Sequence, residues 1–295
     1  MSEESTSPGR NLAPRFEFIE WRLFWEGHLN RSDLEKRFGI STPQASVDLK
    51  NYRDAAGENI EYNATEKRFV VTEAMKPRFL QVSANRLLLQ LRAFVNGVLR
   101  RDDLQFREMP AVDVAPEIVR DVRTEVLRSI LGAIRTKQAV AVEYQSLTSS
   151  RWRDIAPHAL AFDGHRWHAR AWCCEREEFR DFVLTRIKRL GKHKEARFNP
   201  DHDLAWRSKI KLHLCPHPDL STEQSDAIAR DYDMRSGVRK IEMRLSLAYY
   251  FIKRHNLDLD VLDPARAQIR LANLAEVEAA ITDAQKKSKE LSASA

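Results

Sequence analysis

Arginine and histidine side chains recur at strand spacing among apolar residues along residues 151–187. Side chains in an extended strand alternate between two faces. One predicted face of residues 167–172 carries Trp167, Ala169 and Ala171, and the other carries His168, Arg170 and Trp172. The first face is suited to packing and the second offers hydrogen-bond donors, so the pattern predicts a binding site built on strands.

Arg186 follows the same alternation, on a predicted face with Phe182 and Leu184. An arginine on an apolar strand face is costly to bury unless its charge is paired. Two interpretations stay open: Arg186 meets a carboxylate such as Asp154 in an internal salt-bridge network, or it awaits an anionic ligand.

A second group of polar side chains lies between residues 41 and 68. Glutamine can pair bidentately with adenine, whereas serine, threonine and basic side chains hold phosphates. The candidate DNA-binding residues are Ser41, Thr42, Gln44, Ser46, Lys50, Arg53, Lys67 and Arg68.

The elements around this group predict a winged helix-turn-helix. Helices are expected over residues 15–26, 32–38 and 41–56, with Ser32 and Ser41 as N-caps and glycines after the first two helices. In the third helix, Val47, Leu49 and Tyr52 are expected to pack inward. A hairpin over residues 59–71 would form the wing. This segment is nearly neutral, with 12 Lys and Arg against 11 Asp and Glu over residues 10–78. The alternatives to DNA binding are therefore a winged helix used for protein contacts or a plain three-helix core.

The remaining chain predicts two further domains. After a disordered tail (residues 1–14) and the winged helix (15–80), we expect a helical connector and linker over 81–116. A helix over 117–136 would then precede short strands in a small barrel, giving a domain over 117–198. Residues 199–295 would form an α+β domain, so the fold class is α+β multidomain.

Composition favours a soluble protein of the cytoplasm. Of the residues, 43% are hydrophobic and 31% charged, and no apolar run reaches the roughly 18 residues of a membrane helix. Three cysteines give no disulfide framework. The net charge of +6 is concentrated in residues 117–197, with 17 Lys and Arg against 11 Asp and Glu, which predicts an anionic partner there.

Catalytic and metal chemistry find little support. His213, Cys215 and His217 alternate at strand spacing, but prolines interrupt them and no fourth ligand follows, so we expect no metal and no cofactor. There is no glycine-rich phosphate loop or nucleophile elbow. We therefore expect a protein that is not an enzyme.

The motifs together resemble the WYL-domain transcriptional regulators. The resemblance runs from residue 15 onward, through LEKRFGISTPQASVDLKNY, EYQS, PHAL, RWHARAWC and LTRI, with Trp167-His168-Ala169 in place of the eponymous Trp-Tyr-Leu. Within that family the chain is similar to regulators found beside the BREX and CBASS phage-defence systems.

This resemblance implies a homodimer whose winged helices bind a palindromic double-stranded DNA operator. It also implies an Sm-like β-barrel WYL domain that senses a nucleotide or nucleic-acid fragment, and a C-terminal domain with dimer contacts. By motif position, the ligand-binding residues would be Tyr144, Ser146, His158, His168, Arg170 and Arg186. Paired arginines with a tyrosine suit phosphate binding and base stacking.

We therefore expect a DNA-binding regulator, a repressor rather than an activator, whose DNA affinity changes when a ligand fills the middle domain. The alternative is an RNA- or single-strand-binding effector, including a nuclease built on Asp154, Asp163 and His165, that uses the winged helix for dimerisation.

Overall fold

A computed structural model describes residues 12–116, 118, 120–259, 263–264 and 266–294. It divides into two compact units, with the division between residues 117 and 118. The predicted tail lies largely outside the described residues.

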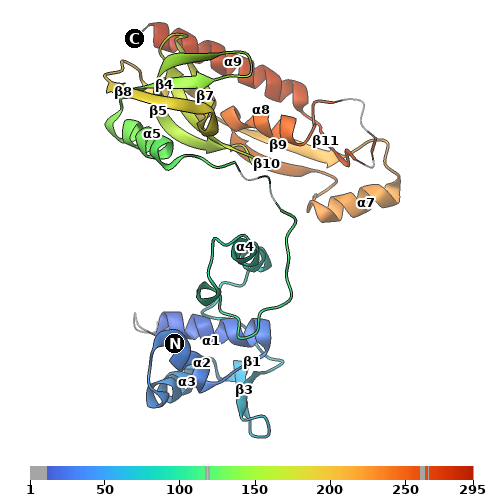
Figure 1. The fold of residues 1–295 in the computed structure, drawn as a ribbon. Helices are drawn as coiled ribbons and strands as arrows, with labels where there is room; N and C mark the ends of the chain where they lie inside the picture. The colour runs from blue at the N-terminus through green and yellow to red at the C-terminus, as the bar shows by residue number, and fades with distance from the viewer. Residues whose placement is uncertain (1–11, 117, 119, 260–262, 265, 295) are drawn as a thin grey trace, which may run out of the picture. The chain divides into compact units, whose positions relative to one another are not determined.

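The first unit is a winged helix-turn-helix followed by a helix (Figure 1). Its elements in chain order are α1 (Ala13–Glu26), β1 (His28–Leu29), α2 (Arg31–Phe38), α3 (Thr42–Ala56), β2 (Ile60–Asn63), β3 (Arg68–Val71) and α4 (Ala84–Val95). The three strands form a small antiparallel sheet in the order β1-β3-β2. The winged helix predicted from the sequence is therefore present.

Local signals explain most helix ends in this unit. Gly27 and Gly39 adopt positive φ of 76° and 62°, where glycine avoids the steric cost of a side chain, and they end α1 and α2. The predicted cap of α2 at Ser32 is wrong, because Asn30 caps it and Asp33 completes the capping box. The side chain of Asp33 accepts a hydrogen bond from the Asn30 backbone N–H at 2.7 Å.

The second unit begins with one helix under a five-stranded antiparallel sheet. Helix α5 (Thr124–Thr136) precedes β4 (Ala139–Gln145), β5 (Ser150–Phe162), β6 (Trp167–Cys173), β7 (Glu178–Val183) and β8 (Ile187–Lys194). The strand order is β7-β6-β5-β4-β8. Apolar residues of α5 and the inward face of the sheet share one buried core, including Ile130, Val142 and Ala169.

The expected barrel is not closed within the described residues. A single turn of 3₁₀ helix, Leu184–Arg186, separates β7 from β8, and β8 then pairs with β4. No ladder joins β7 to β8 there. Helix α5 is also shorter than predicted. The helical spacing of apolar residues over 117–136 includes Ile118, but Ile118 is exposed and does not pack in the core, so the pattern overstated the length of the helix.

The rest of the second unit is a three-stranded sheet with helices. It comprises α6 (Leu204–Arg207), β9 (Lys209–Pro216), α7 (Thr222–Asp231), β10 (Arg239–Arg244), α8 (Leu245–Arg254), β11 (Ile269–Leu271) and α9 (Leu274–Ala293). The sheet order is β10-β9-β11. In Figure 1, α9 runs along the opposite side of the five-stranded sheet from α5, and it contacts β7.

Candidate functional site

Helix α3 presents one face to solvent because its other face is fixed in the core. Ala45, Leu49 and Tyr52 are at most 2% exposed. The Ser41 hydroxyl accepts a hydrogen bond from the Gln44 backbone N–H, as predicted for an N-cap. Val47, which was expected to pack inward, is 48% exposed, so that expectation was wrong.

Two of the candidate DNA-binding side chains are held by neighbours within the helix. The side-chain amide of Gln44 donates to Asp48 Oδ1 at 2.9 Å, and buried Asp48 pairs with Arg15 at 2.5 Å. The Ser46 hydroxyl donates to the Thr42 carbonyl at 3.0 Å. These contacts restrict the orientations in which Gln44 and Ser46 meet a partner.

The basic candidates differ in how available they are. Lys50 and Arg53 are exposed on α3 and form no hydrogen bond or ion pair with the residues that the structure describes. Lys67 is exposed between the wing strands at φ 52°. Arg68 is half-buried and pairs with Glu66 beside the wing turn. Lys50, Arg53 and Lys67 are therefore the cations best placed to meet an anionic surface.

In the second unit, two of the predicted ligand residues have structural partners. Tyr144 is 8% exposed, packs edge-on against Phe182, and its hydroxyl oxygen accepts from the Val183 backbone N–H at 3.1 Å. Ser146 follows the end of β4 rather than lying on its face. Its hydroxyl accepts from the Ser149 backbone N–H at 2.9 Å, which stabilises the β4–β5 turn.

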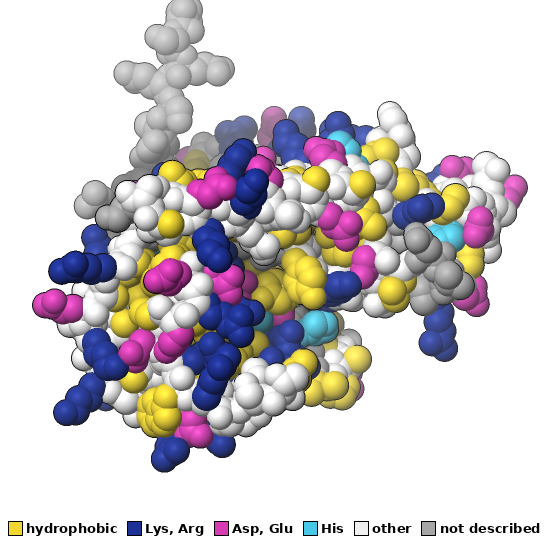
Figure 2. Space-filling model, turned by 90° about the horizontal axis from the view of Figure 1, so that it is seen from above, with side chains coloured by type: hydrophobic (Ala, Val, Ile, Leu, Met, Phe, Trp, Pro, Cys, Tyr) yellow, Lys and Arg dark blue, Asp and Glu magenta, His cyan; other side chains and the backbone are white. Residues whose placement is uncertain are grey.

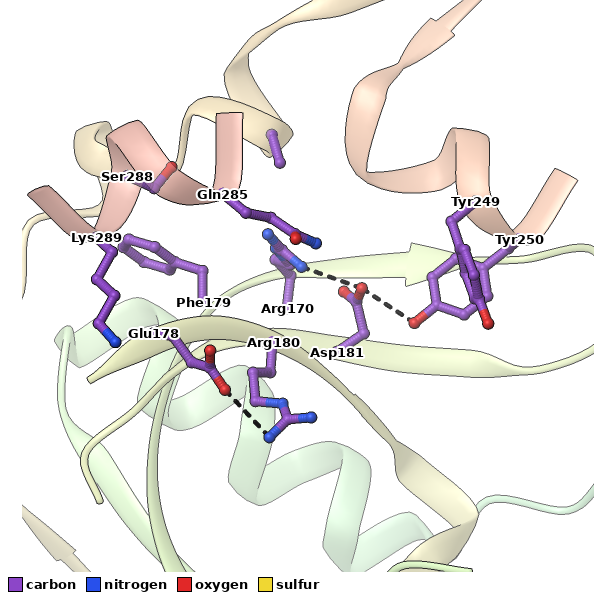
Figure 3. A pocket seen from close by; sticks show the side chains of 11 residues that line it. Arg170, Glu178, Phe179, Arg180, Asp181, Tyr249, Tyr250, Gln285, Ser288 and Lys289 are labelled. Atoms are coloured by element: carbon purple, nitrogen blue, oxygen red, sulfur yellow. Dashed lines mark hydrogen bonds and ion pairs between the residues drawn. The ribbon is translucent and has the colours of Figure 1, made fainter. Parts of the chain in front are cut away.

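Arg170 is the centre of a buried ion network. Its guanidinium donates to both oxygens of Asp203, at 2.8 and 2.9 Å, and to Asp181 Oδ2 at 3.1 Å. The Tyr250 hydroxyl donates to the same Asp181 oxygen at 3.1 Å. Figure 3 shows Arg170 and Tyr250 reaching Asp181 from two sides. Because Asp203 precedes α6 and Tyr250 belongs to α8, the network joins β6 and β7 to the C-terminal elements.

The pKa values in this network follow from burial and charge. Burial opposes the charged form of Arg170 most strongly, but the hydrogen bond to Asp203 and the nearby carboxylates together raise the pKa of Arg170. Burial likewise opposes the carboxylate of Asp203, and the bonds from Arg170 and His158 outweigh it, lowering its pKa to about 2. Burial and the charge of Asp181 raise the pKa of Tyr250, which remains a neutral donor.

Both candidate histidines contact carboxylates. His158 Nε2 lies 2.9 Å from Asp203 Oδ2, and its ring packs edge-on against Phe179. His168 is 1% exposed, with Nε2 2.9 Å from Asp163 Oδ2. The structure therefore brings His158 and Arg170 together on Asp203.

Arg186 is separate from this network. It lies in the 3₁₀ turn after β7, so the predicted strand face shared with Phe182 is wrong. Asp154, its expected partner, instead pairs with Lys194 at 2.7 Å. Arg186 forms no hydrogen bond or ion pair with the residues placed in this structure.

An open cleft of about 430 Å³ adjoins the Arg170 network. Strand β7 supplies Glu178, Phe179 and Arg180 to it, while α8 supplies Tyr249 and α9 supplies Lys289 (Figure 3). Arg180 pairs with Glu178 at 3.1 Å, and both are partly exposed. Cationic and aromatic groups thus border a space that also reaches Arg170.

Sequence reasoning did not identify Asp203, Asp181 or Tyr250. Asp203 lies 33 residues beyond Arg170 in the chain, and no local pattern links them. The sequence offered one signal. His168 and Arg170 share a predicted strand face, and a charged side chain that is buried there requires a carboxylate partner.

Surface charge is mixed on the side of the molecule in Figure 2, where basic side chains gather near the centre of the view with carboxylates among them. Among the described residues, no helix is long and apolar enough to cross a membrane. Over the same residues, no group of three or more His, Cys, Asp or Glu side chains could hold a metal ion.

Three stretches of the chain match known domain families. Residues 11–93 match the BrxR transcriptional regulator winged helix-turn-helix domain, residues 125–191 the WYL domain, and residues 209–277 the BrxR transcriptional regulator C-terminal dimerization domain. The matched order follows the order of elements described above.

Curated relatives match over most of their length. A DNA-binding transcriptional repressor CapW of Pseudomonas aeruginosa is 37% identical over 285 residues, covering 93% of this chain and 95% of that protein. The CapW of Stenotrophomonas maltophilia is 35% identical over 268 residues, covering 89% and 90%. Among solved structures, proteasome accessory factor B/C of Arthrobacter aurescens aligns with 98% of this chain and 51% of that chain, at 16% identity and a TM-score of 0.22, a likeness too weak to carry an argument.

Proposed function

The chain belongs to the CapW family of DNA-binding transcriptional repressors, and on that premise we propose that it represses transcription as a homodimer on a palindromic operator. The solvent face of α3 carries this proposal. It presents small polar side chains beside exposed Lys50 and Arg53, with Lys67 on the wing. A helix with this surface fits the major groove, where polar side chains read base edges and cations contact phosphates.

The dimer follows from the geometry of recognition. A two-fold dimer places two winged helices on two half-sites, so the operator carries the same symmetry as the protein. The match to a C-terminal dimerization domain supports this arrangement. A repressor works where the DNA is, so the cytoplasm is the proposed location.

A nucleotide or nucleic-acid ligand would control the repressor through the WYL domain. The cleft beside Arg170 offers cations at Arg180 and Lys289 and aromatic rings at Phe179 and Tyr249. Phosphates can pair with such cations while bases stack on the rings. Of the motif residues, Arg170 borders this cleft and would meet phosphate there. Arg186 lies in the 3₁₀ turn outside the cleft lining and would meet phosphate separately, while Tyr144, Ser146, His158 and His168 would shape and orient the strands.

Ligand binding would act by shifting a population of dimer geometries. A ligand that binds more tightly to the dimer geometry unable to bind DNA lowers operator affinity. The loss is set by the difference in the ligand's binding free energy for the two geometries, typically about 1 to 3 kcal/mol. An anion that competes with Asp203 for Arg170 would weaken the join between the sheet and α6. The controlled genes would be a phage-defence locus, as with the regulators that the sequence resembles.

Paired variants test these two roles separately. Gln44→Ala combined with Ser46→Ala removes two polar side chains of α3, and we expect it to abolish selective duplex binding while oligonucleotide binding by the second unit persists. Lys289→Ala should retain duplex binding and weaken the binding of short single-stranded DNA to the cleft. We choose Lys289 because it lines the cleft and is exposed, whereas removing buried Arg170 would disturb the fold.

Fluorescence anisotropy with labelled duplex and labelled single strands measures both. If the α3 variant bound duplex like the wild type while short single strands bound more tightly than any duplex, the effector alternative would replace the repressor proposal.

A further inference from the structure

Val47 occupies the solvent side of α3, in the half of the helix nearest its N-terminus. The apolar residues that hold α3 in the core, such as Leu49 and Tyr52, are almost fully buried, but Val47 is 48% exposed. It lies four residues after Pro43 and three before Lys50, both exposed, so all three share one side of the helix. Val47 is thus an apolar group within a polar and basic surface.

The polar neighbours of Val47 already have hydrogen-bond partners within the protein. The Ser46 hydroxyl donates to the Thr42 carbonyl, and the Gln44 amide donates to Asp48. Redirecting either group toward a base would require breaking its present bond. Val47 can contact a base without breaking a hydrogen bond within the protein. Because valine in a helix already occupies essentially one χ1 rotamer, fixing its side chain on contact costs little conformational entropy.

The major groove offers one apolar group among its base edges, the C5-methyl of thymine. This inference rests on the proposed operator binding: we infer that Val47 reads a thymine methyl in each half of the operator. Lys50, one helical turn further on, would hold a phosphate beside that base. Val47 is then a specificity-determining residue.

The test begins with wild-type full-length protein and selection of its preferred site from a random duplex library. Each thymine of that site is then replaced singly by deoxyuridine, which removes the methyl and leaves the hydrogen-bonding edge unchanged. Burial of one such group is worth about 0.8 kcal/mol, so we expect one position in each half-site where the replacement weakens wild-type binding about fourfold.

The variant Val47→Ala should bind the unmodified site about fourfold more weakly per half-site and show no further loss at that same position. Val82→Ala is the matched control, because Val82 is also exposed, at 39%, but lies outside α3. It should keep the full sensitivity to deoxyuridine.

Two results would overturn the inference while leaving the proposed operator binding intact. One is a selected site in which no thymine is sensitive to methyl removal. The other is a sensitive thymine whose penalty is the same in Val47→Ala as in the wild type. If selection recovers no preferred sequence at all, operator recognition fails, and base reading by Val47 fails with it.

Discussion

Replacing Asp203 with asparagine should destabilise the second unit strongly. Asp203 has no exposed side-chain surface, and its two oxygens accept both bonds from the Arg170 guanidinium. The variant retains one acceptor oxygen but removes the charge. Arg170 is itself only 6% exposed, so its charge would keep Asp181 alone as a counter-ion.

The magnitude follows from the cost of an incompletely paired buried charge. Removing one partner of a buried ion pair costs about 3 to 5 kcal/mol. Because Asp181 remains bonded to Arg170, we expect the lower end of that range, about 3 kcal/mol.

Urea denaturation followed by tryptophan fluorescence measures this change, since the Trp206 ring lies 6.0 Å from that of His158, another partner of Asp203. Asp201→Asn is the matched control. Asp201 is two residues away and pairs with Arg207 at the surface, where such pairs contribute less than about 1 kcal/mol. Equal, small effects of the two variants would refute the assignment of Arg170 and Asp203 as the join between the sheet and α6.

Three further outcomes are expected. Lys50→Ala should weaken DNA binding regardless of sequence and reduce the slope of log affinity against log salt by about 0.9 per protomer, whereas Lys286→Ala should leave the slope unchanged in anisotropy titrations. Tyr144→Phe should lower the free energy of unfolding by about 1 to 2 kcal/mol, measured in urea, because the buried Val183 N–H loses its acceptor. Since the pKa of Asp203 is lowered to about 2 from 3.8, its carboxylate stabilises the fold above about pH 4 and loses that contribution as pH falls through about 2. Wild-type protein should therefore lose about 2 kcal/mol more than Asp203→Asn over that interval, and parallel pH profiles would contradict this.

Local patterns predicted the elements well where one face of an element is buried. Alternation over residues 167–172 placed Ala169 and Ala171 in the core and His168 and Arg170 on the other side, as the structure confirms. It failed for Trp167, which is 47% exposed. This residue starts β6 opposite Phe162, at the end of the sheet, where the helix-covered core no longer extends.

Tertiary partners could not be predicted from the same patterns. A strand pattern shows which face Arg170 occupies, but not that Asp203 completes its charge from a different element. Arg186 was placed on a strand because the alternation continues through it, whereas the chain turns there to reach β4. Val47 shows the same limit, because an apolar side chain was assigned to the core on its chemistry, whereas the structure places it on the solvent side of α3.

Selective operator binding through α3 can be measured in a gel shift of purified protein with the DNA immediately upstream of its own coding sequence. We expect a dimer complex on an inverted repeat that persists against an excess of random duplex and is lost with Gln44→Ala and Ser46→Ala. Weak binding that random duplex removes as readily as the upstream sequence would show that α3 does not recognise an operator.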